Sequence, residues 1–441
     1  MRTIEVEFDV TKKINIPSCL FEKKIKDSYI ILAPEYPNWI ILNKEEYQIF
    51  QYLKKNIILN SLLKFKKVSG KKDEEILTIV QSLLIKIEEN KFYAHTNIDQ
   101  EKKVRDIIKK IHINVTNSCN LRCKHCYLSA GINEVLEINF IKLKLFLDNL
   151  YKINGKTEIV VSGGEPLCYN SIYALLKYLK NAGHRVILFT NGILIDNNNI
   201  RYIEKYCDEI QLSMEGISEN YYENIRGKGN YAKLLNTFRL IKDIKIQLTL
   251  AITILEDVFD DIEKELLIFL KNIGMKNITI RLNDEIEKKG NAIHLASSNF
   301  LFDHNKKLRL NNIINNLNHE GYGVGISKAR NIHFSNCGIG TNIVINFDEK
   351  VYPCSMFDID FYNLDTDIGL IIKEFNLLNE CTGIDKMGQH CAVCELKHLC
   401  SGGCRIRNYT ENGSYIIPYC TPEIKEKKFY NLFLEKKSYD H

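Results

Sequence analysis

Three cysteines with the spacing CxxxCxxC restrict the folds open to this chain more than any other feature. Cys119, Cys123 and Cys126 directly follow a β-rich segment, IHINVT at 111–116. Thiolates are the preferred ligands of iron–sulfur clusters, so cysteines at this spacing can hold three irons of a [4Fe–4S] cluster. The fourth iron then has no protein ligand, and catalytic metal sites leave such a position open for a substrate. Taken alone, the three cysteines also fit a structural zinc site or buried thiols.

A second motif, SGGEP at 162–166, supplies what a ligand on that open iron needs. S-adenosylmethionine (SAM) can chelate an iron through its amino and carboxylate groups. Gly163 and Gly164 allow the backbone to come close, and the carboxylate of Glu165 can receive the methionine ammonium. At these residues the chain resembles the radical SAM superfamily. The resemblance implies one [4Fe–4S] cluster and SAM as cofactors.

Further residues match the SAM ligands of that superfamily. Ser213 lies in QLSMEG and Arg226 in NIRG. In the family the matching serine and arginine hold the carboxylate of SAM, which suits a hydroxyl and a guanidinium fork. The family's usual Asp is Glu215 here, and Tyr127, directly after the last cysteine, is expected beside the adenine. A surface ion pair is the alternative for Arg226. No catalytic residue is assigned from the sequence.

Residues 110–325 alternate between predicted strands and amphipathic helices. This alternation predicts an α/β fold with a parallel sheet and right-handed crossovers, and six units fit a partial (β/α)6 TIM-like barrel. The predicted strands span 111–116, 158–164, 185–192, 209–216, 245–253 and 277–282, and the helices 137–152, 171–182, 231–243 and 257–272.

The two motifs agree on where the ligand binds. Parallel α/β folds bind ligands at the carboxyl ends of their strands. Cys119 follows the first predicted strand and Glu165 the second, while Thr190 and Asn191 end the third. These residues are therefore expected at one mouth of the barrel.

Residues 1–100 have a different pattern. Trp39–Asn43 reads as a strand, and Asn43 and Glu46 have the spacing of a capping box for the helix that follows. Phe92 and Tyr93 are predicted to begin a closing strand. The segment resembles a winged-helix precursor-peptide recognition element, and a generic cap on the barrel is the alternative. The helices are expected to bury Ile49, Phe50 and Leu53, then Ile76, Val80, Leu83, Leu84 and Ile87.

The C-terminal part, from residue 326 to 441, carries a second set of cysteines. In order they are Cys337, Cys354, Cys391, Cys394, Cys400, Cys404 and Cys420. The spacing resembles the SPASM extension, which binds two auxiliary [4Fe–4S] clusters; a zinc ribbon is the alternative. The family's usual glycine five positions before the second of these cysteines is Glu349 here, which puts the local turn in doubt.

The resemblance also implies how these cysteines are shared. Cys337, Cys354 and Cys404 would hold the inner auxiliary cluster, whose fourth iron would stay open or take a non-Cys ligand. Cys391, Cys394, Cys400 and Cys420 would hold the outer cluster. The remaining cysteines, expected as buried free thiols, are Cys19, Cys168, Cys207 and Cys381.

Composition fits a cytoplasmic protein. The chain has 441 residues, a net charge of +5 and a pI of about 8.3, without a dense basic tract, so no nucleic-acid partner is expected. No apolar run reaches the roughly 20 residues of a membrane span, and the N-terminus has no signal pattern. Fourteen cysteines in a reducing compartment are better explained by metal ligation than by disulfides.

The resemblance covers a recognition element (1–100), a radical SAM core (101–325) and a SPASM domain (326–441). It implies a maturase of ribosomally made peptides, such as bacteriocin precursors, with three clusters, SAM and an electron donor such as flavodoxin or ferredoxin. The expected product is a sactipeptide-type Cys-sulfur-to-carbon thioether. A carbon–carbon crosslink, formylglycine formation on a protein and, in another class, an iron–sulfur DNA-binding sensor are the alternatives.

Overall fold

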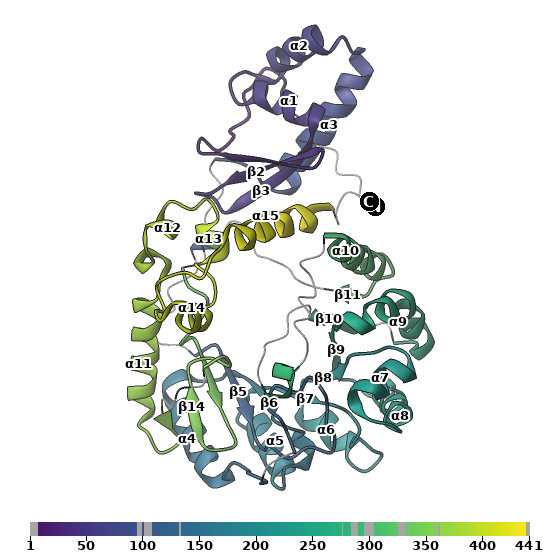
Figure 1. Cartoon of the computed structure of the whole chain (residues 1–441), viewed down its shortest axis with the longest axis vertical. Helices are drawn as coiled ribbons and strands as arrows, with labels where there is room; N and C mark the ends of the chain where they lie inside the picture. The colour runs from purple at the N-terminus through teal and green to yellow at the C-terminus, as the bar shows by residue number, and fades with distance from the viewer. Residues whose placement is uncertain are drawn as a thin grey trace. The chain divides into compact units, whose positions relative to one another are not determined.

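The chain folds into two compact units. The first comprises Met1–Lys103, Ser327–Cys337 and Cys381–His441, and the second Val104–Ile326 and Gly338–Glu380. The boundaries predicted from the sequence divide the chain differently, because N-terminal and C-terminal residues share the first unit. The computed structural model describes residues 8–94, 99–100, 108–131, 134–275, 277–283, 290–294, 304–324, 332–333, 335–357, 359 and 362–437 (Figure 1).

The second unit is built on a parallel sheet whose strands follow chain order from β5 to β10. All six predicted strands are present, which confirms the α/β class and the partial TIM-like barrel. They are β5 (Lys110–Asn114), β6 (Glu158–Ser162), β7 (Arg185–Thr190), β8 (Glu209–Met214), β9 (Gln247–Thr253) and β10 (Ile278–Asn283). The intervening helices are α4 (Phe140–Asn154), α5 (Ile172–Asn181), α6 (Ile200–Tyr206), α7 (Glu219–Arg226), α8 (Tyr231–Lys242), α9 (Phe259–Ile273) and, after β10, α10 (His304–His319).

The sheet extends beyond the six predicted strands. At one edge β11 (Gly323–Val324) pairs parallel with β10, and at the other β13 (Asn342–Ile345) pairs parallel with β5. The antiparallel strands β14 (Lys350–Tyr352) and β15 (Tyr362–Asn363) complete that edge. Helix α11 (Ile368–Cys381) follows them. Strands β13 and β14 overlap the stretch VINFDEKVYPC (344–354), which has a strand-like sequence, whereas β11 and β15 are too short to give a periodic signal.

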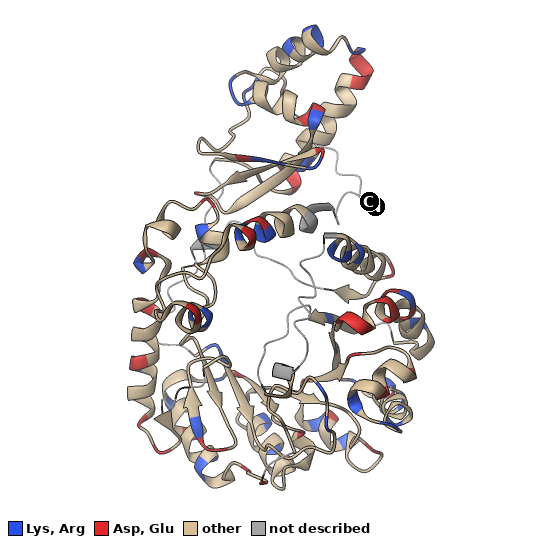
Figure 2. Cartoon of the chain, viewed as in Figure 1, with Lys and Arg blue, Asp and Glu red and all other residues tan. Residues whose placement is uncertain are grey.

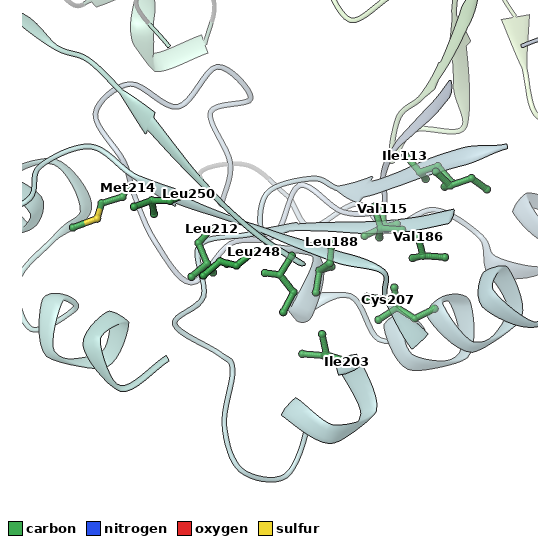
Figure 3. Packing of buried hydrophobic residues seen from close by; sticks show 14 of the residues in the cluster. Ile113, Val115, Val186, Leu188, Ile203, Cys207, Leu212, Met214, Leu248 and Leu250 are labelled. Atoms are coloured by element: carbon green, nitrogen blue, oxygen red, sulfur yellow. The ribbon is translucent and has the colours of Figure 1, made fainter. Parts of the chain in front are cut away.

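Strand alternation sends apolar side chains to the helices and polar ones to the barrel interior. In Figure 3, Val186 and Leu188 of β7 lie on the same side of the sheet as Ile203 of α6 and Cys207. Phe189, which follows Leu188 and therefore lies on the opposite face, makes an edge contact with the ring of His112 at 5.8 Å between centroids.

The amino ends of the strands are joined by a polar network. Arg185 Nη2 donates to Glu209 Oε2 at 2.6 Å, and Arg185 also pairs with Glu158. Lys110 Nζ lies 2.9 Å from Glu158 Oε1, and Thr249 Oγ1 donates to Glu209 Oε1 at 2.7 Å. These bonds fix the first residues of neighbouring strands, and the carboxyl ends are left to form a site.

The N-terminal part of the first unit has three antiparallel strands followed by three helices. The capping box at Asn43 and Glu46 is present, with bonds of 2.9 and 2.8 Å. The predicted closing strand is wrong: Phe92 and Tyr93 are in no strand, and Phe92 is fully buried in the core instead. The elements are β1 (Phe21–Ile25), β2 (Ser28–Ala33), β3 (Asn38–Asn43), α1 (Lys44–Leu53), α2 (Ile58–Ser69) and α3 (Asp73–Glu89), of which β1, β2 and α2 were not predicted. The predicted apolar faces of α1 and α3 are buried as expected.

Both faces of this small sheet are covered. Ile31 and Ile40 face the core formed with α1, α2 and α3. On the opposite face, Trp39 packs with Phe429 and Leu432 of α15 (Pro422–Lys437), and Trp39 Nε1 donates to the carbonyl of Leu432 at 3.0 Å. Because side chains alternate between the two faces of β2 and β3, one face packs on the N-terminal helices and the other packs on the last helix of the chain.

The rest of the first unit is a series of short elements. Figure 2 shows basic and acidic residues interspersed along the helices of both units. Within the described ranges, no helix has the length and apolar character needed to cross a membrane. The short elements are β4 (Asp99–Gln100), paired with β12 (Ile332–His333), then η4 (Ile384–Lys386), α12 (Gln389–Ala392), α13 (Lys397–Cys400) and α14 (Arg405–Asn412).

Candidate active site

A cavity of about 340 Å³ lies at the carboxyl ends of the barrel strands. It brings together residues from the loops after β5 and β6, from β8 and from α7. Of the nine site residues predicted in the barrel, eight line it: Cys119, Cys123, Cys126, Tyr127, Gly163, Gly164, Ser213 and Arg226. The ninth, Glu165, lies behind the wall.

The cysteine loop is held in place by polar side chains at the end of β5. Asn117 Nδ2 donates to the carbonyl of Glu134 at 2.8 Å, and Asn117 Oδ1 accepts from Leu136 N at 2.8 Å. The loop also buries Leu121, whose N–H donates to Cys119 Sγ at 3.3 Å. The sulfur positions are therefore set by the protein before any metal binds.

Burial favours the protonated thiol forms of Cys119 and Cys123. Burial raises the pKa of Cys119 to about 12 and also raises the pKa of Cys123. Metal ligation requires the thiolate, so cluster assembly releases protons here. Among the described residues, no three His, Cys, Asp or Glu side chains converge on a single point suited to one metal ion. A [4Fe–4S] cluster binds each thiolate at its own iron, and three thiols along one cavity wall fit that requirement.

The glycines of SGGEP are needed where two loops meet. Gly163 has a φ of +138°, and a Cβ there would lie 2.5 Å from the carbonyl of Thr116. A Cβ on Gly164 would lie 2.3 Å from the carbonyl of Ser118. The backbone N–H of Gly164 donates a hydrogen bond to the carbonyl of Thr116 at 2.7 Å. The glycines thus close the second loop onto the cysteine loop, in addition to lining the cavity.

Glu165 is fully buried and bonded to the next strand. Its carboxylate accepts from Thr190 Oγ1 at 2.7 Å, from Asn191 N at 2.8 Å and from Leu167 N at 3.1 Å. Burial raises its pKa, and these bonds oppose the rise. The carboxylate ties the end of β6 to the end of β7. Its expected contact with the methionine ammonium stays a prediction.

Asn191 connects the same strand end to the cysteine loop. Its Nδ2 donates to Asn120 Oδ1 at 2.8 Å and lies 3.9 Å from Cys119 Sγ. Its Oδ1 accepts from Ile193 N at 3.0 Å. Sequence analysis placed Asn191 at the barrel mouth without a role, because position at a strand end does not reveal the partner.

Arg226 is held by a buried carboxylate. Its Nη2 donates to Glu215 Oε1 at 2.8 Å and its Nε to Glu215 Oε2, while His125 Nε2 lies 3.1 Å from Oε1. Burial raises the pKa of Glu215, but the charges of Arg226 and His125 outweigh it and hold that pKa well below its usual range. This fork does not use Nη1 of Arg226, and Arg226 is one of the residues that line the cavity. His125 was not predicted, although it lies between two of the cysteines.

The inner wall of the cavity carries polar residues that sequence analysis missed. His112 Nε2 lies 3.1 Å from Asn114 Oδ1, and burial lowers the pKa of His112 to about 4, so the ring is neutral. Arg281 Nη1 donates to Gln211 Oε1 at 3.4 Å. Alternation along the strands was the available signal, since these residues lie at inward positions of β5, β8 and β10.

A short segment far along the sequence covers the cysteine loop. Asn291, in η3 (Gly290–His294), donates from its N to the carbonyl of Cys126 at 2.8 Å and from Nδ2 to that of Cys123 at 3.3 Å. A Cβ on Gly290 would lie 2.3 Å from the carbonyl of Tyr127. No periodic pattern marks this segment in the sequence.

Comparison with known proteins identifies the barrel. Residues 113–270 match the family model of the Radical SAM superfamily, and this range holds both loops and all nine predicted barrel residues. The chain contains a radical SAM domain. Members of the superfamily use a [4Fe–4S] cluster and SAM, and the donor set at this cavity fits both.

Two curated relatives and one solved structure extend the comparison beyond this radical SAM domain. An AdoMet-dependent heme synthase of Oleidesulfovibrio alaskensis is 24% identical over 347 residues, covering 71% of this chain and 87% of that protein. The antilisterial bacteriocin subtilosin biosynthesis protein AlbA of Bacillus subtilis is 23% identical over 312 residues, covering 68% and 67%. Streptococcus suis SuiB bound to S-adenosylmethionine shares the fold with a TM-score of 0.57 at 16% identity, covering 92% of this chain and 99% of that one.

Outside the radical SAM domain, the structure gathers four C-terminal cysteines. They line a small pocket in the first unit, of about 30 Å³, and burial raises the pKa of Cys391 to about 11. The four are Cys391, Cys394, Cys400 and Cys420, the set expected to hold the outer cluster. Cys337 and Cys404 belong to the same unit and Cys354 to the second unit, so the inner cluster stays a prediction.

The turn before Cys354 keeps its shape without the usual glycine. Glu349 adopts a φ of +65° between β13 and β14, and its N donates to the carbonyl of Asn346 at 2.9 Å. Lys142 Nζ donates to Glu349 Oε2 at 2.7 Å. This left-handed conformation costs a non-glycine residue roughly 1–2 kcal/mol, and the bonds on both sides of the turn hold it.

The four remaining cysteines were all expected to be buried thiols, and one is. Cys207 is buried in the core of the barrel. Cys168 is half-buried, and Cys19 and Cys381 are exposed, so the expectation is wrong for these three. A cysteine outside a periodic segment gives no signal of its burial.

Proposed function

We propose that this protein is a radical SAM maturase that links a cysteine sulfur to a carbon atom within a ribosomally made precursor peptide. The observation that carries the proposal is the combination, in one chain, of the SAM-type cavity, the three-stranded N-terminal sheet with its helices and the pocket with four cysteines. Similarity to AlbA over 68% of the chain supports a peptide substrate. The SuiB fold, which covers 92% of the chain, has also been solved with the precursor peptide SuiA.

The residues of the cavity have distinct tasks in this reaction. When bound, the cluster and SAM supply one-electron cleavage of a carbon–sulfur bond and removal of hydrogen from an unactivated carbon. Cys119, Cys123 and Cys126 bind the irons, Ser213 and Nη1 of Arg226 orient the SAM carboxylate, and Tyr127 packs by the adenine. The other walls exclude water and hold the peptide carbon close to the reacting centre.

The polar inner wall gives the peptide its contacts. Gln211 and Arg281 present an amide and a guanidinium to the cavity, and His112 presents a neutral ring. Gln211 and Arg281 can donate hydrogen bonds to backbone carbonyls or side-chain oxygens of an extended segment. The neutral ring of His112, whose Nε2 faces Asn114 Oδ1, offers only its Nδ1 as an acceptor. Holding the segment fixed is the main contribution the protein makes to a radical reaction.

The three-stranded N-terminal sheet is proposed to bind the leader of the precursor. Helices cover one face of the sheet and α15 the other, so within the described residues an added peptide can pair with the edge strands β1 and β3. Pairing at an edge gives affinity through backbone hydrogen bonds and choice of partner through side-chain pockets. A bound leader raises the local concentration of the core peptide at the cavity.

The C-terminal cysteines are proposed to hold two auxiliary clusters. With the cluster of the barrel, the whole chain would then hold three clusters. Their role is to accept the electron returned by the substrate radical or to bind the substrate thiolate. Flavodoxin or ferredoxin is the proposed electron donor. Anaerobically reconstituted protein is expected to hold roughly twelve irons and twelve sulfides per chain, since each cluster has four of each.

The test is reconstitution with reductant, SAM and the precursor from a neighbouring small open reading frame. The expected products are 5′-deoxyadenosine and a peptide lighter by two hydrogen atoms whose cysteine resists iodoacetamide. Absence of 5′-deoxyadenosine would refute the proposed radical SAM activity. A peptide that loses two hydrogens but keeps an alkylatable cysteine would indicate a carbon–carbon crosslink instead.

A second candidate comes from the heme synthase relative, which matches 71% of this chain. A porphyrin substrate would also need a radical at the same cavity. Incubation with SAM, reductant and a porphyrin precursor of heme separates the two candidates. Formation of the heme absorption spectrum at the rate of 5′-deoxyadenosine release supports this candidate, and SAM cleavage that depends on the precursor peptide supports the maturase.

A further inference from the structure

One arginine of the first unit is buried among the C-terminal cysteines. Arg405 is 0% exposed and begins helix α14, directly after Cys404. Its guanidinium interacts electrostatically with Cys337, Cys391, Cys400 and Cys404. A buried cation thus lies within electrostatic range of side chains that the maturase proposal assigns to the auxiliary clusters.

The described part of the protein offers this cation no counter-ion. Arg405 Nε donates to the carbonyl of Thr382 at 2.7 Å and Nη1 to that of Gly403 at 2.7 Å, while Nη2 is buried without a partner. No carboxylate in the described residues forms an ion pair with it. The N-terminal end of α14 adds further positive potential. A buried charge without a partner is strongly unfavourable, so an anion is expected here.

The packing leaves no room for Arg405 to turn away. Gly402 and Gly403 both have positive φ, +77° and +78°, and carry the chain over the guanidinium. A Cβ on Gly402 would lie 3.2 Å from Arg405 Nη1 and 1.9 Å from Met387 Sδ. The charge is therefore fixed beside the cysteines.

We propose that Arg405 is the countercharge of the auxiliary-cluster thiolates and that it raises the reduction potential of the cluster they hold. The inference rests on the auxiliary clusters of the proposed function. A [4Fe–4S] cluster with four thiolate ligands is an anion and gains one more negative charge on reduction. A fixed cation beside it favours the reduced state, because charge and hydrogen bonds at the sulfurs set cluster potentials. Nη2 has no other acceptor and is placed to donate to such a sulfur.

The test uses full-length protein in which Cys119, Cys123 and Cys126 are replaced by Ala, so that only C-terminal iron remains. In this background Arg405→Gln removes the charge, Arg405→Lys keeps it, and Arg407→Gln removes a charge at an exposed position two residues away. Each protein is reconstituted anaerobically, analysed for iron and sulfide, and titrated with dithionite while the reduced cluster is followed by electron paramagnetic resonance. Dithionite supplies the electron and is oxidised to sulfite.

Arg405→Gln is expected to lower the equilibrium constant for one-electron reduction at least tenfold, a potential about 59 mV more negative. Arg405→Lys is expected to retain most of the wild-type potential, and Arg407→Gln all of it. Equal reduction potentials in Arg405→Gln and Arg407→Gln would overturn the role proposed for Arg405 and would leave the auxiliary clusters in place. If the Arg405→Gln variant holds no iron, the Arg405→Lys variant decides the question. A normal iron content in Arg405→Lys supports the countercharge, and an equal loss of iron in Arg405→Lys overturns it. If the parent protein with the three Ala replacements holds no iron, the auxiliary clusters of the proposed function are refuted, and the role of Arg405 with them.

Discussion

The two units each bury an arginine beside a cysteine set, and the two arginines are treated in opposite ways. In the barrel, Arg226 is 5% exposed and shares two hydrogen bonds with the carboxylate of Glu215. In the first unit, Arg405 is 0% exposed and, among the residues that the structure describes, has only backbone carbonyls as acceptors. The barrel therefore carries its own countercharge for Arg226. Under our proposal the C-terminal cysteine region would take its countercharge from the bound cluster, and its stability would then depend on that cluster.

The sharpest test of this contrast replaces cysteines in each region. Cys119 and Cys123 changed together to Ala should abolish 5′-deoxyadenosine formation, because the cluster loses two ligands, yet leave thermal stability unchanged. Cys391 and Cys394 changed together to Ala should remove the ligand-derived charge beside Arg405 and lower stability. Emission of Trp39, which packs in the same buried cluster as Cys394, reports the second change. Equal stability of the two double variants would contradict the contrast.

A second test removes the carboxylate partner of the buried arginine in the barrel, so that Arg226 becomes unpaired, as Arg405 is among the described residues. Glu215→Ala leaves Arg226 buried without a carboxylate, and breaking a buried ion pair in this way costs about 3–5 kcal/mol. Urea unfolding of the iron-free protein, followed by circular dichroism, measures the cost. Glu219→Ala, at an exposed position of the neighbouring helix α7, is the matched control and should change little. A cost below 1 kcal/mol would mean that the barrel tolerates an unpaired arginine.

A third test concerns Glu165, the other buried carboxylate of the barrel. Glu165→Ala should weaken SAM binding by roughly 10–150-fold, since a charge-assisted hydrogen bond is worth about 1.5–3 kcal/mol. Equilibrium dialysis of SAM with cluster-loaded protein measures it. Thr190→Val removes one donor to the carboxylate but keeps the carboxylate itself. An equal loss in Thr190→Val would show that Glu165 shapes the loop and does not contact SAM.

The smallest expected effect is a difference in pH dependence between these two carboxylates. The pKa of Glu215 is lowered on folding from 4.5, so its stabilising contribution is complete above that value and is lost as pH falls below it. The pKa of Glu165 is raised from 4.5, so the folded state gains protons and its stability falls as pH rises above that value. Urea unfolding of Glu215→Gln and Glu165→Gln between pH 3 and 8 should therefore flatten opposite limbs of the stability profile. Parallel profiles for the two variants would refute the assignment.

Local sequence determined the parts of this protein whose signals lie within a few residues. The spacing of Cys119, Cys123 and Cys126, the two glycines of SGGEP and the capping box at Asn43 each encode a local geometry. The six barrel strands and the buried face of α3 follow from periods of two and 3.6 residues. Because the carboxyl ends of parallel strands share one edge, these local signals were also enough to place the cavity.

Only the tertiary structure decided which distant residues become partners. Glu165 bonds to Asn191, 26 residues on, and Trp39 to Leu432, 393 residues away. No spacing rule assigns Glu215 to Arg226 or leaves Arg405 without a carboxylate. These pairings depend on how elements pack after they form, and burial then sets their energy by removing water from the charges. A sequence read alone gives the chemical type of each side chain, while its partner and its burial come from the fold.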